Sequence, residues 1–296
     1  MSSSRAYRLK ADEPLPEGIA RVARGRIDHA LDELRGKTDS TPEEAVHEAR
    51  KDMKKLRALL RLARGELGES SFARENACFR DAARELAGTR DTDMMLETLG
   101  GLELPDPLGR ELRKAIQAGR APADGDGRVA AAGRAAAMLT EARTRVDDWP
   151  LERESFDAVC EGLERTYRRG RRDLRAARAE PSVEALHEWR KRVKELWYHH
   201  TLLRELWPPV MAATGDEAHA LADRLGDDHD LAVLAEWVGE RADGGPELPD
   251  EVERRRGALQ AGAFRLGARL YAEKPSAYVR RLRRLWNARE AIVRAP

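Results

Sequence analysis

The sequence has few aromatic residues, almost no cysteine and a net charge close to zero. Only 5% of its 296 residues are Phe, Trp or Tyr, which disfavours a β-sheet protein because strands are enriched in aromatic and β-branched side chains. Cys78 and Cys160 are isolated in the sequence, so we expect two structural thiols and neither a disulfide framework nor a cysteine-based zinc site. The formal net charge of +1 at pH 7 leaves open whether acids and bases are sorted onto different faces.

Long apolar runs are also absent. No stretch approaches the about 20 apolar residues that a membrane-spanning helix needs, and the first segment, MSSSRAYRLK, lacks the apolar centre of a secretion signal. We therefore expect a cytoplasmic protein that does not span a membrane. Hydrophobic residues still make up 41% of the chain, which is enough for a packed core in one large or two medium domains.

The abundant residues are Ala, Leu, Arg and Glu, and this composition favours helices. Apolar residues recur at three- and four-residue intervals along nearly the whole chain, as in helices that bury one face. Segments rich in proline and glycine, such as DSTPEE, APADGDG and ELWPP, separate these patterns. Together they predict an all-α fold of roughly ten helices.

One predicted helix carries a cationic face. Thr41, Pro42 and Glu44 have the pattern of a capping box with proline in the first helical turn. The buried stripe is predicted to contain Val46, Ala49, Met53, Leu56, Leu60 and Ala63. The opposite side carries His47, Arg50, Lys51, Lys54 and Arg61, flanked by Lys55 and Arg57. This cationic stripe is about 20 Å long, and the acids Glu48 and Asp52 lie off its centre.

The chain repeats itself at an offset of about 140 residues. EAVHEARKDMKKLRALLRL from Glu44 matches EALHEWRKRVKELWYHHTLL from Glu184, which aligns His47 with His187, Arg50 with Arg190, Lys51 with Lys191 and Lys54 with Lys194. GGLELPD matches GGPELPD, and RDTDMML matches DDHDLAVL, which aligns Asp91 with Asp228 and Asp93 with Asp230. Because order and offset are both kept, we predict two similar helical bundles, residues 1–149 and 150–296, related by a pseudo-two-fold axis. Such an axis would bring the two cationic stripes to one shared groove.

A weaker repeat adds basic residues near the head of each half. ARGRIDHAL in the first half matches RRGRRDLRA in the second, and both contain the sequence Arg-Gly-Arg. The additional candidate contacts are Arg24, Arg26, Arg168, Arg171 and Arg172. A lower-ranked set near the end of the chain contains Arg280, Arg281, Arg283 and Arg284.

The pattern His-x-x-Arg-Lys-x-x-Lys, once per half on a helix after a Thr-Pro or Pro-Ser cap, resembles the CHAD family (conserved histidine α-helical domain). LAGTRDTD and LGDDHD resemble the acidic motif of that family. The resemblance covers essentially the whole chain. It implies two helical bundles with internal two-fold symmetry, and binding of inorganic polyphosphate along a basic surface or channel. We expect a stand-alone member, because we find no tunnel-type triphosphatase domain, to which the family is often fused.

The second half departs from the family pattern. Glu195 and Trp197 stand where family members often carry basic residues, and Asp227 stands where the first half has Arg90. These differences predict that the two halves contribute unequally to binding.

Elementary electrostatics is consistent with this ligand. A linear polyanion offers repeated charge, which favours many Lys and Arg contacts at helical spacing, and affinity should fall steeply with salt. The predicted binding set is His47, Arg50, Lys51, Lys54, Lys55, Arg57, Arg61, His187, Arg190, Lys191, Lys194, Arg24, Arg26, Arg168, Arg171 and Arg172, with Asp91, Asp93, Asp228 and Asp230 as supporting acids. Each histidine could donate to phosphate when protonated or orient an acid when neutral.

Other interpretations of these patterns stay open. A cationic helix face is ordinarily just solvated, and the four acids could begin helices, hold basic residues in place or bind a metal with His187. A nucleic-acid-binding protein would interleave aromatic residues with the basic ones, and a helical adaptor for an acidic protein would expose an apolar seam as well. A metal-dependent phosphohydrolase would need a carboxylate cluster. We predict no cofactor, no metal site and no catalytic residues.

Overall fold

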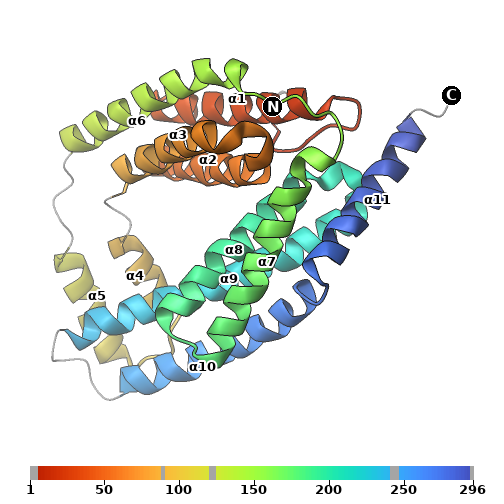
Figure 1. Ribbon diagram of the computed structural model, residues 1–296. Coiled ribbons are helices and arrows are strands. Elements are labelled where there is room, and N and C mark those ends of the chain that lie inside the picture. The colour runs from red at the N-terminus through yellow and green to blue at the C-terminus, as the bar shows by residue number, and fades with distance from the viewer. Residues whose placement is uncertain (1–5, 88–90, 120–124, 241–246, 294–296) are drawn as a thin grey trace.

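The structure is a computed structural model that describes residues 6–87, 91–119, 125–240 and 247–293. This part of the chain forms eleven α-helices and two short 3-10 helices, with no β-strand (Figure 1). The predicted all-α fold class is confirmed. None of the helices described combines the length and the apolar content needed to cross a lipid bilayer.

Four helices of the first half pack together at one side of the molecule (Figure 1). They are α1 (Leu15–Leu34), α2 (Pro42–Leu62), α3 (Arg64–Glu85) and α6 (Gly125–Arg145). Helix α2 begins as its capping box predicts, because Thr41 accepts from the Glu44 backbone N–H and Glu44 accepts from the Thr41 backbone N–H. Its predicted apolar stripe faces the core, with Met53, Leu56 and Leu60 fully buried.

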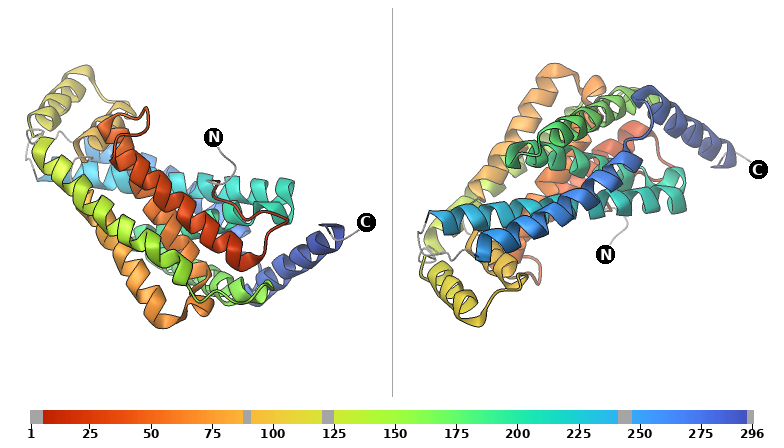
Figure 2. Two further views of the ribbon diagram at one scale, coloured as in Figure 1. Left: turned by 90° about the horizontal axis from the view of Figure 1, so that it is seen from above. Right: turned by 90° about the horizontal axis from the view of Figure 1, so that it is seen from below.

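The second half forms the other side of the molecule. Its helices are α7 (Asp157–Ala179), α8 (Val183–Leu202), α9 (Pro208–Gly239), α10 (Glu247–Leu270) and α11 (Pro275–Val293). Helix α8 lies between α7 and α9, and its first turn is capped by the Ser182 hydroxyl, which accepts from the Ala185 backbone N–H. Both views in Figure 2 show α11 extending away from the rest of the molecule.

Two short helices of the first half cross over to the second. Helices α4 (Asp91–Gly100) and α5 (Asp106–Ala118) lie against α9 and α10, away from α1, α2 and α3 (Figure 1). A separate apolar cluster holds them there, formed by Met95, Leu99, Leu102, Leu112 and Ile116 with Leu231, Leu234, Val238 and Val252. Burial of these side chains therefore ties the two halves together at one end of the molecule.

The main core is continuous across the predicted boundary at residue 149. Helix α2 contacts both α7 and α8, and one apolar cluster includes residues from both halves. The His199 ring of α8 is hydrogen-bonded through Nε2 to the Ala58 carbonyl of α2 at 3.0 Å. Gly162 allows α7 to approach the end of α2, because a Cβ atom there would collide with the Leu62 carbonyl. The two halves consequently form a single packed unit around the crossing of α2 and α8.

The aligned acidic motifs lie in different local structures. Asp91 is the first residue of α4, whereas Asp228 and Asp230 lie inside α9, which is continuous from Pro208 to Gly239. The alternative in which GDDHD begins a helix is therefore wrong for the second half. Gly226 of this motif serves helix packing, since a Cβ there would come 2.5 Å from the Arg190 guanidinium.

Candidate anion-binding site

The motif residues of α2 lie on the face predicted from the sequence. His47 and Arg50 are half-buried, and Lys54 is exposed. Lys51 Nζ lies 2.7 Å from Glu48 Oε1, one helical turn earlier. Arg50 Nη1 donates to the Leu86 backbone carbonyl at 3.4 Å, which joins α2 to the end of α3.

The motif residues of α8 repeat this local geometry. Lys191 Nζ lies 2.5 Å from Glu188 Oε1, again one turn earlier. Arg190 Nε donates to the Ala222 backbone carbonyl of α9 at 3.3 Å, and its guanidinium packs on Gly226. In each half, the motif arginine thus contacts the next long helix, while the motif lysine pairs with a glutamate of its own helix.

The crossing of α2 and α8 brings parts of the two motif segments within electrostatic range of each other. Tyr198 of α8 is buried there, and burial is the main cause that raises the pKa of its hydroxyl to about 12. Asp52 and Glu48 of α2 also raise this pKa, while Arg190 of α8 lowers it. Charged groups of both motif helices, α2 and α8, therefore act on one side chain at the crossing.

Two of the predicted phosphate contacts instead serve a buried acid. Asp52 is only 1% exposed and accepts from Arg26 Nη1 at 3.1 Å, while the His29 ring Nδ1 lies 2.6 Å away. Lys55 Nζ lies 3.5 Å from the same carboxylate. Burial lowers the pKa of Lys55, and Asp52 opposes this shift. Arg26 and Lys55 are consequently held under the stripe rather than presented on its surface.

Beyond Ala58, the α2 stripe continues as an arginine cluster that involves α7 and α8. Arg61 lies 3.3 Å from Glu195, which also accepts from Arg192 at 2.5 Å. Burial, and then the charge of Arg61, lowers the pKa of Arg57 to about 10. Burial, and then Arg192, also lowers the pKa of Arg169. Several arginines therefore lie close together in this cluster, and Glu195 balances only part of their charge.

Sequence reasoning missed Arg169 and Arg192 as members of this cluster. Arg192 is 7% exposed and also lies 3.5 Å from Asp173 of α7. Its place directly after Lys191 on α8 was the available signal. Glu195, expected only to weaken the second stripe, is the buried acid that joins Arg61 to Arg192.

The Arg-Gly-Arg residues pair mainly outside the motif helices. Arg24 contacts Asp147 at 2.6 Å, and Arg168 contacts Glu164 of its own helix at 2.5 Å. Arg172 contacts its neighbour Asp173 at 2.8 Å. Arg171 is half-buried and lowers the pKa of Tyr167, which burial raises overall. The ion pairs of these arginines lie on α7 and at the short helix η2 (Val146–Asp148), not on α2 or α8.

The supporting acids do not form one group. Asp228 is buried and accepts from Arg256 Nε at 3.1 Å and from Gln260 at 2.8 Å, so it holds cationic and amide side chains of α10. Asp93 is exposed on α4, and Asp230 is half-buried on α9. The side chains of Asp91 and of Arg90 lie outside the described residues. Within the described chain, no group of three or more His, Cys, Asp or Glu residues is arranged to hold a metal ion.

His187 has a partner that was quoted in the acidic motif but not predicted as a site residue. Its ring lies against that of His229 of α9, with centroids 4.6 Å apart. Neither Nδ1 atom has a hydrogen-bond partner among the described residues, and both are buried. Burial lowers the pKa of His187, and His229, Lys191 and Arg190 lower it further.

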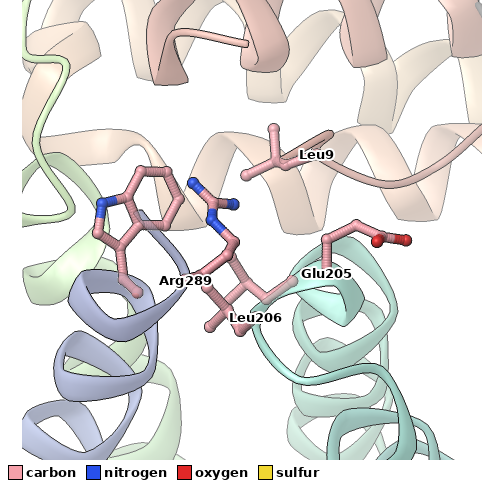
Figure 3. A pocket seen from close by; sticks show the side chains of 6 residues that line it. Leu9, Glu205, Leu206 and Arg289 are labelled. Atoms are coloured by element: carbon pink, nitrogen blue, oxygen red, sulfur yellow. The ribbon is translucent and has the colours of Figure 1, made fainter. Parts of the chain in front are cut away.

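A shallow pocket lies away from these residues, between the N-terminal segment, the 3-10 helix η3 (Arg204–Leu206) and α11 (Figure 3). Leu9, Leu203, Glu205, Leu206, Trp286 and Arg289 line it. The Arg289 guanidinium lies over the Trp286 ring at 3.9 Å. Because this pocket contains none of the predicted contacts, the candidate site is the cationic surface of α2 and α8.

Comparison with known proteins fits this arrangement. The family model described as CHAD domain matches residues 21–239. The chain belongs to the CHAD family. The resemblance inferred from the two motifs is therefore confirmed, and CHAD domains are polyphosphate-associated helical domains.

A solved CHAD structure has the same fold. The crystal structure of the CHAD domain from the plant Ricinus communis is similar with a TM-score of 0.64 and 21% sequence identity. The match covers 91% of this chain and 96% of that one. A comparison with curated proteins gives no match.

Proposed function

We propose that this CHAD protein binds inorganic polyphosphate without cleaving it, through a cationic surface to which α2 and α8 both contribute. The observation that carries the proposal is the matched geometry of Arg50 with Lys51 and of Arg190 with Lys191. Each motif arginine is anchored on a helix carbonyl, and the lysines beside it lie at the surface or half-buried. Cations fixed in this way suit a ligand whose only regular feature is its charge.

Two features support a polyanion without bases over a nucleic acid. Trp189 of α8 is fully buried, and Trp197 packs on His219 at 4.0 Å between ring centroids. Aromatic side chains near the motif are thus used for packing, whereas single-stranded nucleic acids bind on exposed aromatic rings.

The acids near the site support a non-catalytic role. Glu48, Glu188 and Glu195 each pair with a cation of α2 or α8. A metal-dependent phosphohydrolase needs carboxylates that converge on a divalent ion. Acids that form ion pairs with arginine and lysine are instead suited to holding these cations in position. In the cell, such a protein would associate with polyphosphate stores and organise them.

The test is binding of labelled long-chain polyphosphate, with single-stranded DNA and RNA as competitors and with phosphate release followed in parallel. The binding variant changes Lys51, Lys54, Lys191 and Lys194 to Gln, which removes charge but keeps Arg50 and Arg190 as helix contacts. A matched control changes Arg110, Lys114, Arg265 and Arg269, which are exposed elsewhere, to Gln. Loss of binding in the first variant alone, with a preserved helical spectrum, is the expected result. Equal preference for DNA, or equal loss in both variants, would contradict the proposal.

A further inference from the structure

The rings of His187 and His229 form a pair at the junction of α8 and α9, inside the proposed site. His187 and Arg190 are one turn apart on α8, and Gly226 and His229 are one turn apart on α9. Arg190 packs on Gly226, and His187 packs on His229. The two imidazoles therefore continue the line of contact that positions the motif arginine.

The charged groups that act on His187 are mostly positive. From α8, Arg190 and Lys191 lower the pKa of His187, and only Glu188 raises it. From α9, His229 lowers it as well. Glu188 is already hydrogen-bonded to Lys191. Two acids of α9, Asp228 and Asp230, flank His229 in the sequence. Asp228 is held by Arg256 of α10, and Asp230 is half-buried. Burial acts in the same direction as the cations, because it disfavours an added charge.

A bound phosphate would oppose the effect of these cations on the pKa of His187. Its negative charge beside Arg190 and Lys191 would offset the repulsion that keeps a proton away from the His187 imidazole. Two adjacent rings 4.6 Å apart would repel each other if both were protonated, so one proton per pair is the expected gain. The proton comes from solvent and adds to an imidazole nitrogen, and no covalent bond to phosphorus forms or breaks.

We propose that His229 is a further phosphate-binding residue, and that the His187–His229 pair takes up a proton when polyphosphate binds. This inference rests on the proposed function. It assigns the second half a proton-linked contact, so binding should tighten as pH falls, by at most about tenfold per pH unit for one linked proton.

Calorimetry measures the proton directly. Binding of long-chain polyphosphate is measured at one neutral pH in buffers that differ in ionisation enthalpy, and the slope of the observed enthalpy gives the protons taken up. The variant is His229→Gln. The control is His219→Gln, which alters another α9 histidine that pairs with Asp223 at 3.0 Å. Protonation of the polymer ends is the same for every variant and cancels in the comparison.

We expect His229→Gln to bind more weakly and to take up measurably less proton than the unchanged protein, while His219→Gln matches the unchanged protein. Equal proton uptake by the unchanged protein and by His229→Gln, with both binding, would overturn this inference and leave the proposed function standing. Absence of binding in the unchanged protein would instead overturn the proposed function, and this inference with it.

A second measurement avoids substitution altogether. The imidazole Cε1–H resonances of the unchanged protein are followed by NMR against pH, with and without polyphosphate. One resonance of the pair should move to its protonated position at neutral pH when polyphosphate is added. If both stay at the neutral-imidazole position in the saturated complex, the inference is wrong.

Discussion

Asp52 of α2 and Arg192 of α8 each follow the motif histidine of their helix by five residues, and both are buried, but their charges are opposite. Asp52 gathers Arg26, His29 and Lys55. Arg192 gathers three acids, Asp173, Glu188 and Glu195. The two halves thus place a buried ion-pair centre at the same position with inverted sign.

The inversion extends to the neighbouring residue. Lys55 and Glu195 each follow the buried centre by three residues, and each pairs with it, at 3.5 Å and 2.5 Å respectively. Such a buried centre needs compensating charges, whichever sign it has. The comparison shows that the helix packing accommodates a buried ion pair of either polarity at this position. It also explains why Lys55, which the sequence placed beside the cationic stripe, pairs with the buried carboxylate of Asp52.

Substitution of the buried centres should have the largest effect. Asp52→Asn leaves Arg26 and Lys55 without their carboxylate, and we expect the free energy of unfolding to fall by about 3–5 kcal/mol. Arg192→Met should cost less, because Glu195 keeps Arg61 as a partner. Urea denaturation measures both. A loss under about 1 kcal/mol for Asp52→Asn, typical of an exposed pair, would show that the centre is not a structural requirement.

Acid should destabilise the second half through two core histidines. His199 and His200 stand where the repeat places Leu59 and Leu60 in α2, and burial lowers the pKa of His200 from 6.5 to about 3. The unfolded chain binds a proton on His200 more readily than the folded protein does. The stabilisation from burying neutral His200 is therefore complete above pH 6.5, and it is lost as the pH falls toward 3. One such group costs about 2 kcal/mol at pH 5.

The check is the urea midpoint at pH 7 and at pH 5, for the unchanged protein and for His200→Leu, which copies the first half. The variant loses the hydrogen-bond partner of the Tyr278 hydroxyl and should be less stable at pH 7. Its pH dependence should nevertheless be smaller than that of the unchanged protein. If the two proteins showed the same pH dependence of stability, His200 would not be a cause of the loss of stability in acid.

Gly226→Ala should separate binding from folding in the second half. The added Cβ would come 2.5 Å from Arg190 Nη2, the flexible end of a side chain, so Arg190 moves and the helices stay packed. Alanine favours the helix by about 1 kcal/mol, so stability should not fall. We expect polyphosphate affinity to fall by about threefold to tenfold. Gly239→Ala, where the Cβ meets nothing within 4 Å, is the control, and equal affinity of the two variants would contradict the role of Arg190.

The acids that pair with the motif lysines should give the smallest effect. Glu188 is hydrogen-bonded to Lys191, which lowers the pKa of the Glu188 carboxyl, and Glu48 makes the equivalent pair with Lys51. Glu48→Gln and Glu188→Gln should change the free energy of unfolding by less than about 1 kcal/mol. Each should raise polyphosphate affinity modestly, because a repelling charge is gone. An affinity loss in either variant would show that the acid positions its lysine.

Local patterns predicted much of the fold. Thr41 and Ser182 begin α2 and α8 as their sequences indicate, and the family resemblance followed from two short motifs. The division of residues 1–149 from 150–296, and their origin in a duplication, stay predictions. The crossing of α4 and α5 to the second half had no local signal, since an apolar face does not specify which partner covers it.

The sequence predicted which residue types form the candidate site, but it did not predict which of their side chains are buried. Helical spacing places Lys54 and Arg57 on one face of α2, but only the packing of α8 on Ala58 separates the exposed lysine from the arginine cluster. Arg26 was expected at the surface, but it is buried against Asp52. This pairing had no local signal because Asp52 is distant in sequence. The pairing of His229 with His187 had no local signal, because it depends on the packing of α9 against α8.

The most direct test of a surface shared by both halves is the salt dependence of polyphosphate binding. Lys51→Gln with Lys54→Gln, and Lys191→Gln with Lys194→Gln, should each lower the slope of log affinity against log salt by on the order of 1.5, and by twice that when combined. If either pair alone leaves both slope and affinity unchanged, the polymer binds one half only, and the account of α2 and α8 as one surface is wrong.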